Sequence, residues 1–413
     1  MAHHTAFQKD RIPLAIEPLD PLFFRDGRPF GAGNHRGISG LPTPRTLSGM
    51  LRWQLIERTG ADPAEFKHED RDKRHWLARL AVRGPWLATL EPGGAAVSDV
   101  YTAPPAHLMR RGKGEHGPLA LLAPLGPSVT LPGWNQPNPY DGQPPLAPPW
   151  DGWQTEPLTP LAGRLLNRAG LARVLAGQTP DDKDHVVKHA SLFTFEDRVG
   201  VGIDPATQTG ADGLLYSLRL IRLQEHTGFY AEVGIEDDDE KAVENLRALL
   251  RPGSGFIAPF GGEGRRVAVR VLEKPFEWPS APADAIAPED GGFTSLLVTP
   301  ACFAPRDPAV STGRQFPPHP LGTLAAAALG RPAVESGWHL GGGGRAGRAA
   351  GVARPTRLLV PAGSTYFWRR GRNAREETGA PATWHQLAQT PVDRAAGYGL
   401  ALRGVWQWWS ARG

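Results

Sequence analysis

The sequence predicts an α+β protein of two ferredoxin-like (RRM-like) domains, each with the element order βαββαβ, and a long Pro/Gly-rich insertion in the first domain. Its 413 residues exceed what one hydrophobic core usually serves. The hydrophobic pattern gives strand, helix, hairpin, helix and strand in the first part of the chain, and a similar order returns in the second part. We therefore expect a first domain over residues 1–280, with its insertion at about 61–210, and a second domain over residues 281–413.

The first strand and the first helix are expected close to the start of the chain. Residues 12–19 alternate in character as a strand does, and an Arg/Gly-rich loop follows over residues 25–40. Thr46 is expected to cap a helix after Pro44, and Gly60 is expected to end it. The inward face of this helix consists of apolar residues at helical spacing: Leu47, Met50, Leu51 and Leu55.

The chain between residues 61 and 210 shows no such order. Pro and Gly are dense from Pro118 to Trp153, which is typical of a long insertion rather than of a separate core. Trp134, Trp150 and Trp153 offer rings that stack on bases, but aromatic residues flanked by Pro more commonly hold a loop against the body of a protein.

Regular structure resumes after the insertion. Two strand-like runs, Leu214–Leu223 and Gly228–Ile235, predict a hairpin. Asp238 or Asp239 is expected to cap the next helix, and acidic residues crowd its first turn. An alternating strand over residues 265–273 completes the first domain.

The second domain is expected to repeat this order. Its predicted elements are a strand at Thr294–Pro300, a helix at Leu321–Leu329, a strand pair that includes Arg357–Trp368, a helix at Trp384–Ala396 and a last strand at Leu400–Trp409. In both halves a Gly-rich turn leads into the final strand.

The composition favours a cytoplasmic protein without a membrane segment. Hydrophobic residues make up 40% of the chain and charged residues 21%, and no apolar run approaches membrane-spanning length. The single Cys302 excludes a disulfide framework and a zinc knuckle.

Arginine is concentrated in one window of an otherwise mildly basic chain, whose net charge is +4. Between Ser336 and Arg375 no acidic residue occurs, while Arg345, Arg348 and Arg357 lie in this window with further arginines. Such a patch fits phosphate, and it equally fits a solvated basic loop.

A second candidate for phosphate binding is the Gly-rich turn Gly261-Gly262-Glu263-Gly264 with Arg265 and Arg266. Glycine lacks a Cβ, so backbone N–H groups of such a turn approach a phosphate closely, and arginine adds bidentate hydrogen bonds. In a ferredoxin-like module this turn lies beside the first helix, so Arg52 is expected to line one cleft with Arg265 and Arg266. The alternatives are a plain chain reversal for the turn and a surface salt bridge with Glu57 for Arg52.

Catalytic and metal-binding motifs are scarce in this sequence. We expect no catalytic residue, no metal and no cofactor, because Walker A, HExxH, paired Cys and nucleophile-elbow patterns are missing from the 413 residues. His185 and His189 share one helical spacing, but they are more typical of surface histidines than of a metal site. His35 in the Arg/Gly-rich loop is the one candidate for metal-free acid–base cleavage of RNA, and contact with phosphate or backbone is the alternative.

Four segments taken together resemble a known family. They are Phe24-Arg25-Asp26-Gly27-Arg28-Pro29-Phe30, then Thr46, Gly49 and Arg52 at spacings of three, then Gly261-Gly262-Glu263-Gly264-Arg265, then Val360-Pro361-Ala362-Gly363-Ser364-Thr365-Tyr366-Phe367. In their order and spacing, from about Ile12 to Trp409, they are similar to the third Cmr subunit of type III-B CRISPR effector complexes, a member of the repeat-associated mysterious protein (RAMP) superfamily.

The resemblance implies a non-catalytic subunit that holds the 5′ handle of the guide RNA (crRNA). Its partners would be the large polymerase-palm subunit, the first backbone RAMP subunit and, indirectly, target RNA. The residues to which the resemblance assigns handle contact are Arg52, Gly261, Gly262, Gly264 and Arg265, with Arg25, Arg28 and Arg36 of the loop. Charge alone adds Arg266, Arg345, Arg348 and Arg357. Two other functions stay open: a metal-free RAMP endoribonuclease that processes precursor crRNA through His35, and a protein-only bridge between subunits.

Overall fold

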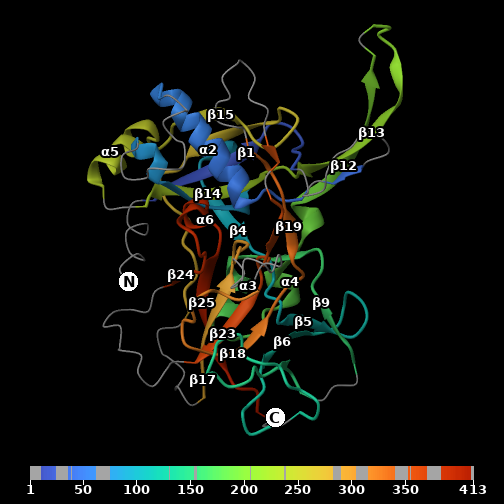
Figure 1. The fold of residues 1–413 in the computed structure, drawn as a ribbon, viewed down its shortest axis with the longest axis vertical. Coiled ribbons are helices and arrows are strands. Elements are labelled where there is room, and N and C mark those ends of the chain that lie inside the picture. The colour runs from blue at the N-terminus through green and yellow to red at the C-terminus, as the bar shows by residue number, and fades with distance from the viewer. Residues whose placement is uncertain are drawn as a thin grey trace.

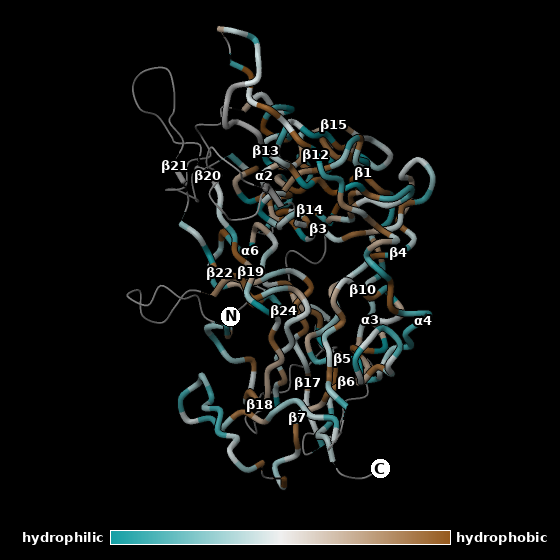
Figure 2. Tube along the Cα trace, turned by 90° about the vertical axis from the view of Figure 1, so that its right-hand side faces the viewer, coloured by the Kyte–Doolittle hydropathy of each residue, from teal (hydrophilic) through white to brown (hydrophobic). Residues whose placement is uncertain are grey.

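The protein is a mixed α/β molecule with many strands and few helices, and two larger sheets occupy opposite halves of its long axis (Figures 1 and 2). The computed structural model describes residues 11–24, 36–38, 40–61, 75–129, 131–152, 156–204, 206–236, 239–281, 290–303, 315–339, 352–353, 355–369 and 383–410. Among these residues, no helix is long and apolar enough to cross a membrane.

The first sheet has six antiparallel strands. In spatial order they are β15 (Gly255–Pro259), β16 (Arg266–Val271), β1 (Ile12–Pro18), β14 (Thr227–Ile235), β3 (Leu80–Leu90) and β4 (Val97–Tyr101). The strands predicted at residues 12–19 and 265–273 are therefore confirmed, and they are direct neighbours as β1 and β16.

Helix α2 (Pro44–Thr59) covers one face of this sheet. Its N-cap is Thr43 and not Thr46 as predicted: the Thr43 side chain accepts a hydrogen bond from the Thr46 backbone N–H, with Pro44 at the first helical position. Gly60, at φ 66°, ends the helix as predicted. The predicted apolar face is confirmed, since Leu47, Met50, Leu51 and Leu55 are all buried.

Helix α5 (Glu240–Leu249) covers the same face. Asp239 caps it, because its carboxylate accepts a hydrogen bond from the Ala242 N–H at 3.0 Å. Leu246 is buried in the core that both helices share with the sheet. Burial of each such leucine stabilises the fold by roughly 1.5–3 kcal/mol.

The hairpin predicted at Leu214–Leu223 and Gly228–Ile235 is wrong. Strand β13 (Gly210–Leu223) pairs instead with β12 (Phe193–Ile203), and β14 pairs with β3 from within the predicted insertion. Gly84-Pro85 interrupts the apolar pattern of β3. The pair lies at a bulge opposite Ala231, where the missing N–H of proline breaks no hydrogen bond between the strands.

The remainder of the predicted insertion forms small elements around the two sheets. Three short ladders are β5 (Leu108–Arg111) with β6 (Leu119–Leu121) and β9 (Leu158–Pro160), β10 (Arg164–Leu166) with β11 (Val186–Lys188), and β7 (Ala123–Pro124) with β8 (Pro149–Trp150). Helices α3 (Arg168–Leu175) and α4 (Asp182–His185) and the 3-10 helices η3 (Trp76–Arg79), η4 (Pro92–Gly94) and η5 (His189–Ser191) complete it.

The Pro-rich segment lies against the second sheet. Asn138 donates a hydrogen bond to the Leu324 carbonyl at 3.0 Å, and Tyr140 donates one to the Pro317 carbonyl at 2.8 Å. The Trp134 indole N–H bonds to the Leu146 carbonyl at 2.7 Å. These contacts favour the interpretation that its aromatic residues hold the segment in place; Trp153 lies outside the described residues.

The second sheet has five antiparallel strands, in the order β18 (Thr323–Ala328), β23 (Thr365–Arg369), β17 (Gly291–Leu297), β25 (Leu400–Gln407) and β24 (Trp384–Gln386). The helix predicted at Leu321–Leu329 is wrong: the alanines of this run form β18, because pairing with β23 and burial override their helix propensity. The helix predicted at Trp384–Ala396 is reduced to α6 (Pro391–Ala396), after β24. The last strand is confirmed as β25.

The two sheets share one arrangement of strands. In the first sheet the order of the four corresponding strands is β16-β1-β14-β3, and in the second sheet it is β25-β17-β23-β18. In each half, the first strand therefore lies between the last long strand and the third, and the second strand lies beyond the third. Two further ladders, β19 (Ala333–Glu335) with β22 (Arg357–Leu359) and β20 (Trp338–His339) with β21 (Val352–Ala353), flank the second sheet.

Candidate nucleic-acid interface

The Gly-rich turn closes the hairpin between β15 and β16. Phe260 N–H bonds to the Arg265 carbonyl at 2.8 Å, and Arg265 N–H bonds to the Gly262 carbonyl at 3.3 Å. The two central residues, Glu263 and Gly264, have φ of 58° and 63°, which is the geometry of a type I′ turn. A Cβ on Gly264 would meet open space, so the outer side of this turn is bare main chain.

Gly261 holds the turn against another part of the chain. Its φ is 88°, and a Cβ would lie 2.5 Å from the Phe23 carbonyl oxygen, so only glycine fits. The next residue, Gly262, donates its N–H to the same oxygen at 2.8 Å. Phe24 packs edge-on against Phe260 with ring centroids 5.1 Å apart. The turn is therefore fixed to the residues that directly precede Arg25.

Both ends of the Arg/Gly-rich loop meet at this place. The Phe24 carbonyl accepts a hydrogen bond from Gly40 N–H at 3.4 Å, so the two residues that flank residues 25–39 meet beside the Gly-rich turn. Arg25, Arg28 and His35 lie outside the described residues. The structure thus brings together two regions that the sequence analysis selected separately.

The base of the long β12–β13 hairpin borders the same region (Figure 1). Leu22 and Ile221 exchange backbone hydrogen bonds of 2.8 Å in both directions. Strand β2 (Arg36–Ile38) runs parallel to β13, with Arg36 opposite Ser217. We call Leu22–Phe24, β2, the facing part of β13 and the turn Gly261–Arg266 the glycine-turn surface.

The charged side chains of the turn differ in their surroundings. Arg266 is exposed, while Arg265 is half-buried and its Nε has no hydrogen-bond acceptor among the described residues. Glu263 is exposed at the tip and places one negative charge between the glycines. A phosphate would have to approach from the arginine side.

The structure does not bring Arg52 into a cleft with this turn. Its guanidinium donates a hydrogen bond to the Leu80 carbonyl at 3.2 Å, and Leu80 pairs with Ile235 beyond the Ile12 end of β1. Arg266 lies beyond the other end of β1, where its carbonyl accepts the Leu19 N–H at 3.1 Å. The two predicted contacts therefore lie at opposite ends of the first sheet.

Arg357 lies in a buried ion cluster of the second half. It donates hydrogen bonds to Asp393 at 2.7 Å and to Glu335 at 2.9 Å, and its guanidinium lies 5.0 Å from the Tyr398 ring centroid. Burial alone would lower its pKa, but the bond to Asp393 and the neighbouring negative charges raise it above the ordinary value. Its charge is thus already used inside the protein, while Arg345 and Arg348 lie outside the described residues.

The family model for CRISPR-associated protein (Cas_Cmr3) matches residues 14–406. The chain belongs to the Cas_Cmr3 family. The family predicted from the sequence is confirmed by this match.

Solved structures similar to this Cas_Cmr3 chain come from type III complexes. A chain in the cryo-EM structure of the type III-B Cmr-beta bound to cognate target RNA is 16% identical, with 86% of each chain covered and a TM-score of 0.43. A chain of the Csm3-Csm4 subcomplex of the type III-A interference complex is 10% identical over 86% of this chain and 92% of that one, with a TM-score of 0.34. No curated protein matches the sequence.

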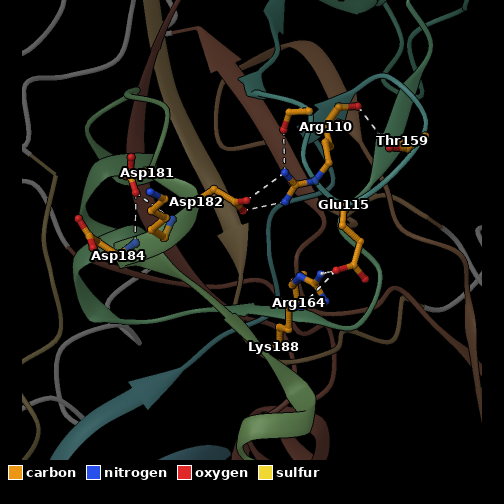
Figure 3. Close-up of polar contacts among 10 residues, drawn as sticks. Arg110, Glu115, Thr159, Arg164, Asp181, Asp182, Asp184 and Lys188 are labelled. Atoms are coloured by element: carbon orange, nitrogen blue, oxygen red, sulfur yellow. Dashed lines mark hydrogen bonds and ion pairs between the residues drawn. The ribbon is translucent and has the colours of Figure 1, made fainter.

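A group of ion pairs in the predicted insertion has a structural role in this Cas_Cmr3 chain. The buried Arg110 of β5 forms a bidentate pair with Asp182 of α4, at 2.7 and 3.0 Å, and also donates to the Gly117 carbonyl (Figure 3). Glu115 pairs with both Arg164 and Lys188. The first contact fastens β5 to α4, and the second fastens the turn after β5 to β10 and β11.

His185 takes part in the same helix start. Its Nδ1 accepts the backbone N–H of Asp181 at 2.8 Å. Within the part of the chain that the structure describes, three or more potential ligands do not gather into any metal site. The Nδ1 of His185 is thus engaged in a hydrogen bond at the start of α4.

Sequence reasoning missed the arginines of the β12–β13 hairpin. Arg219 pairs with Asp197 at 2.8 and 2.9 Å, and this bond raises the pKa of the arginine. Arg222 donates to Glu196 at 2.6 Å. The sequence does contain a signal for the strand β12, because residues 193–203 alternate in character and are rich in Phe and Val.

Proposed function

We propose that this Cas_Cmr3 chain holds the 5′ handle of the crRNA on its glycine-turn surface. The observation that carries the proposal is the attachment of the Gly-rich turn to Phe23 and Phe24, the residues that directly precede the Arg/Gly-rich segment in the sequence. Bare main chain then lies next to the arginines Arg265 and Arg266. This combination suits a phosphate backbone, because N–H groups approach closely and guanidinium groups supply charge-assisted hydrogen bonds.

The half-buried guanidinium of Arg265 supports the same proposal. A buried donor without an acceptor costs about 1–3 kcal/mol, and more when it is charged. Its Nε lacks an acceptor among the described residues. A phosphate or sugar oxygen of the handle, or an acceptor that the handle orders, would remove this cost.

Both halves are proposed to be ferredoxin-like modules. The first sheet supports this through its order β16-β1-β14-β3 and through helices α2 and α5 on one face. The second sheet has the corresponding order β25-β17-β23-β18, with α6 before its last strand. The boundary near residue 280 lies in the connection between β16 and β17.

The proposed subunit has no catalytic activity of its own. It docks the large polymerase-palm subunit and the first backbone RAMP subunit, and it meets target RNA only through the guide. The basis is the sequence, which lacks the common catalytic motifs, and the family resemblance. His35 is the residue on which the alternative, metal-free cleavage of precursor crRNA, depends.

Removal of the Arg265 charge tests the handle-binding proposal. Arg265→Ala is expected to weaken handle binding by the assembled complex and to reduce the slope of log affinity against log salt by about one. Arg331→Ala, which removes an exposed arginine of the second half, is the matched control and should leave both quantities unchanged. Equal affinity and equal slope for Arg265→Ala and the wild type would refute the proposal.

The salt dependence of crRNA binding by Arg52→Ala tests how far the bound handle extends along the first sheet. A reduced salt slope for this variant would mean that the RNA reaches the opposite end of the first sheet. An unchanged slope would limit the handle to the glycine-turn surface.

Incubation of the complete chain with repeat RNA in EDTA tests the non-catalytic role. We expect intact RNA. If the wild type cleaves the RNA at a specific place and His35→Ala abolishes this cleavage, the protein is an endoribonuclease and the non-catalytic role is wrong.

A further inference from the structure

Strand β15 is an outer strand of the first sheet. Among the residues that the structure describes, it pairs with β16 alone, and its sequence Gly-Phe-Ile-Ala-Pro contains no charged side chain. Ile257, at its centre, is 57% exposed. Natural proteins usually protect such an apolar edge with charge, a bulge or a covering segment, because an open edge attracts another strand.

The register shows which backbone groups the edge offers. Val271 N–H bonds to the Ser254 carbonyl and Phe260 N–H to the Arg265 carbonyl, both at 2.8 Å, so the even-numbered residues of β15 bond to β16. The N–H and C=O groups of Gly255 and Ile257 therefore point outward, together with the carbonyl of Pro259. Across the described residues, no acceptor is found for the two outward N–H groups.

A pocket of about 300 Å³ lies beneath the edge, on the face of the sheet away from α2. Glycines 94, 253 and 255 leave it open, and Ala15, Ala268 and Ile257 supply apolar walls. Glu17 and Arg270 contribute one charge of each sign, so the pocket has no net charge. It has room for an apolar side chain that enters from the β15 edge.

We propose that β15 is a docking edge for an extended segment of a neighbouring protein subunit, which adds a strand to the first sheet and places an apolar side chain in the pocket. Outward donors and acceptors that alternate along an extended backbone match another extended backbone. RNA fits less well, because the strand carries no cation and Glu17 offsets the one cation of the pocket, Arg270.

A second copy of this chain also fits less well than another subunit. In a two-fold pairing about Ile257, each Pro259 would face Gly255 of the other copy, so two ladder bonds would be missing instead of the one that a different partner strand loses. The proposal rests on the place of the chain in a multi-subunit complex and not on handle binding, so each can fail without the other.

Hydrogen exchange of the full chain tests the docking edge in the wild type. We expect the amides of Gly255 and Ile257 to exchange at least ~10-fold more slowly in the complete complex than in the free chain. The inward amides of Phe256 and Ala258 are protected already and serve as internal references.

Three results would overturn the docking edge. Unchanged exchange of Gly255 and Ile257 in the complete complex would show that no strand is added. Protection by crRNA alone would make the edge an RNA site. Protection that rises with the concentration of the free chain would make it a contact between copies.

Ile257→Pro removes one outward donor and leaves the inward ladder intact, because proline is tolerated at the outward positions of an edge strand. We expect at least ~10-fold weaker association with the protein subunits and an unchanged salt slope for crRNA binding. Ile257→Val is the matched control and should assemble as the wild type does. Wild-type assembly of the Ile257→Pro variant would contradict the docking edge; if this variant fails to fold, the wild-type exchange data decide.

Discussion

At the scale of single residues, His107 is the clearest case of a titratable group kept neutral by the fold. Its side chain is buried, and its ring packs edge-on against Phe367 with centroids 5.0 Å apart. Nδ1 finds no hydrogen-bond partner among the described residues. Burial lowers the pKa of His107 to about 3, since a charged imidazolium would lack solvation there.

This shift predicts that acid destabilises the protein through His107. The unfolded chain binds the proton near the ordinary pKa of about 6.5, whereas the folded chain does not. The contribution is therefore fully present above that pH and declines as the pH falls toward 3, by up to ~1.4 kcal/mol per pH unit. His107→Leu should make the stability less dependent on pH, as measured by urea unfolding between pH 4 and 7. Parallel curves for the two proteins would contradict the assignment.

A second residue-scale prediction concerns Arg110. Asp182→Ala removes its bidentate partner and leaves a buried guanidinium with one carbonyl acceptor, so we expect a loss of about 1–3 kcal/mol in the free energy of unfolding. The exposed pair of Glu115 is the control, and Glu115→Gln should have no measurable effect. Equal losses for both variants would show that burial of Arg110 does not matter.

At the scale of elements, local signals explain which parts of the fold are predictable from sequence. α2 and α5 each have a side-chain N-cap and an apolar face within one stretch of chain, and both helices were predicted. β18 and β3 depend on partners distant in sequence. The alanines of β18 favour a helix by their intrinsic propensity, and pairing with β23 makes them a strand. Pro85 would normally end a strand, but in β3 it lies at a bulge opposite β14.

The candidate site shows the same limit. The Gly-Gly-Glu-Gly pattern predicts a tight turn, and the turn is present. Its attachment to Phe23 is a contact between residues that lie far apart in the sequence, so no local sequence pattern predicts it. The position of Arg52 at the other end of β1 likewise follows from strand register and not from the sequence of α2.

At the scale of the whole molecule, the two sheets are joined by a common core. Trp86 and Tyr230 of the first sheet pack in one cluster with Trp384 and Leu402 of the second. The Trp86 indole N–H bonds to the Val298 carbonyl at 2.9 Å. The halves are therefore expected to lose their structure together, although each has its own sheet.

This coupling predicts that a cavity in one sheet weakens the other. Leu402 is fully buried in the common core, so Leu402→Ala should cost roughly 2–5 kcal/mol. The loss should appear equally in the exchange of slow amides of β14 and of β23, because both unfold in one cooperative step. Val334→Ala, at a half-exposed position of β19, is the control and should change neither. Loss of protection in β23 with β14 unaffected would instead mean that the two halves unfold independently, and that docking on the first sheet and packing of the second can be separated by mutation.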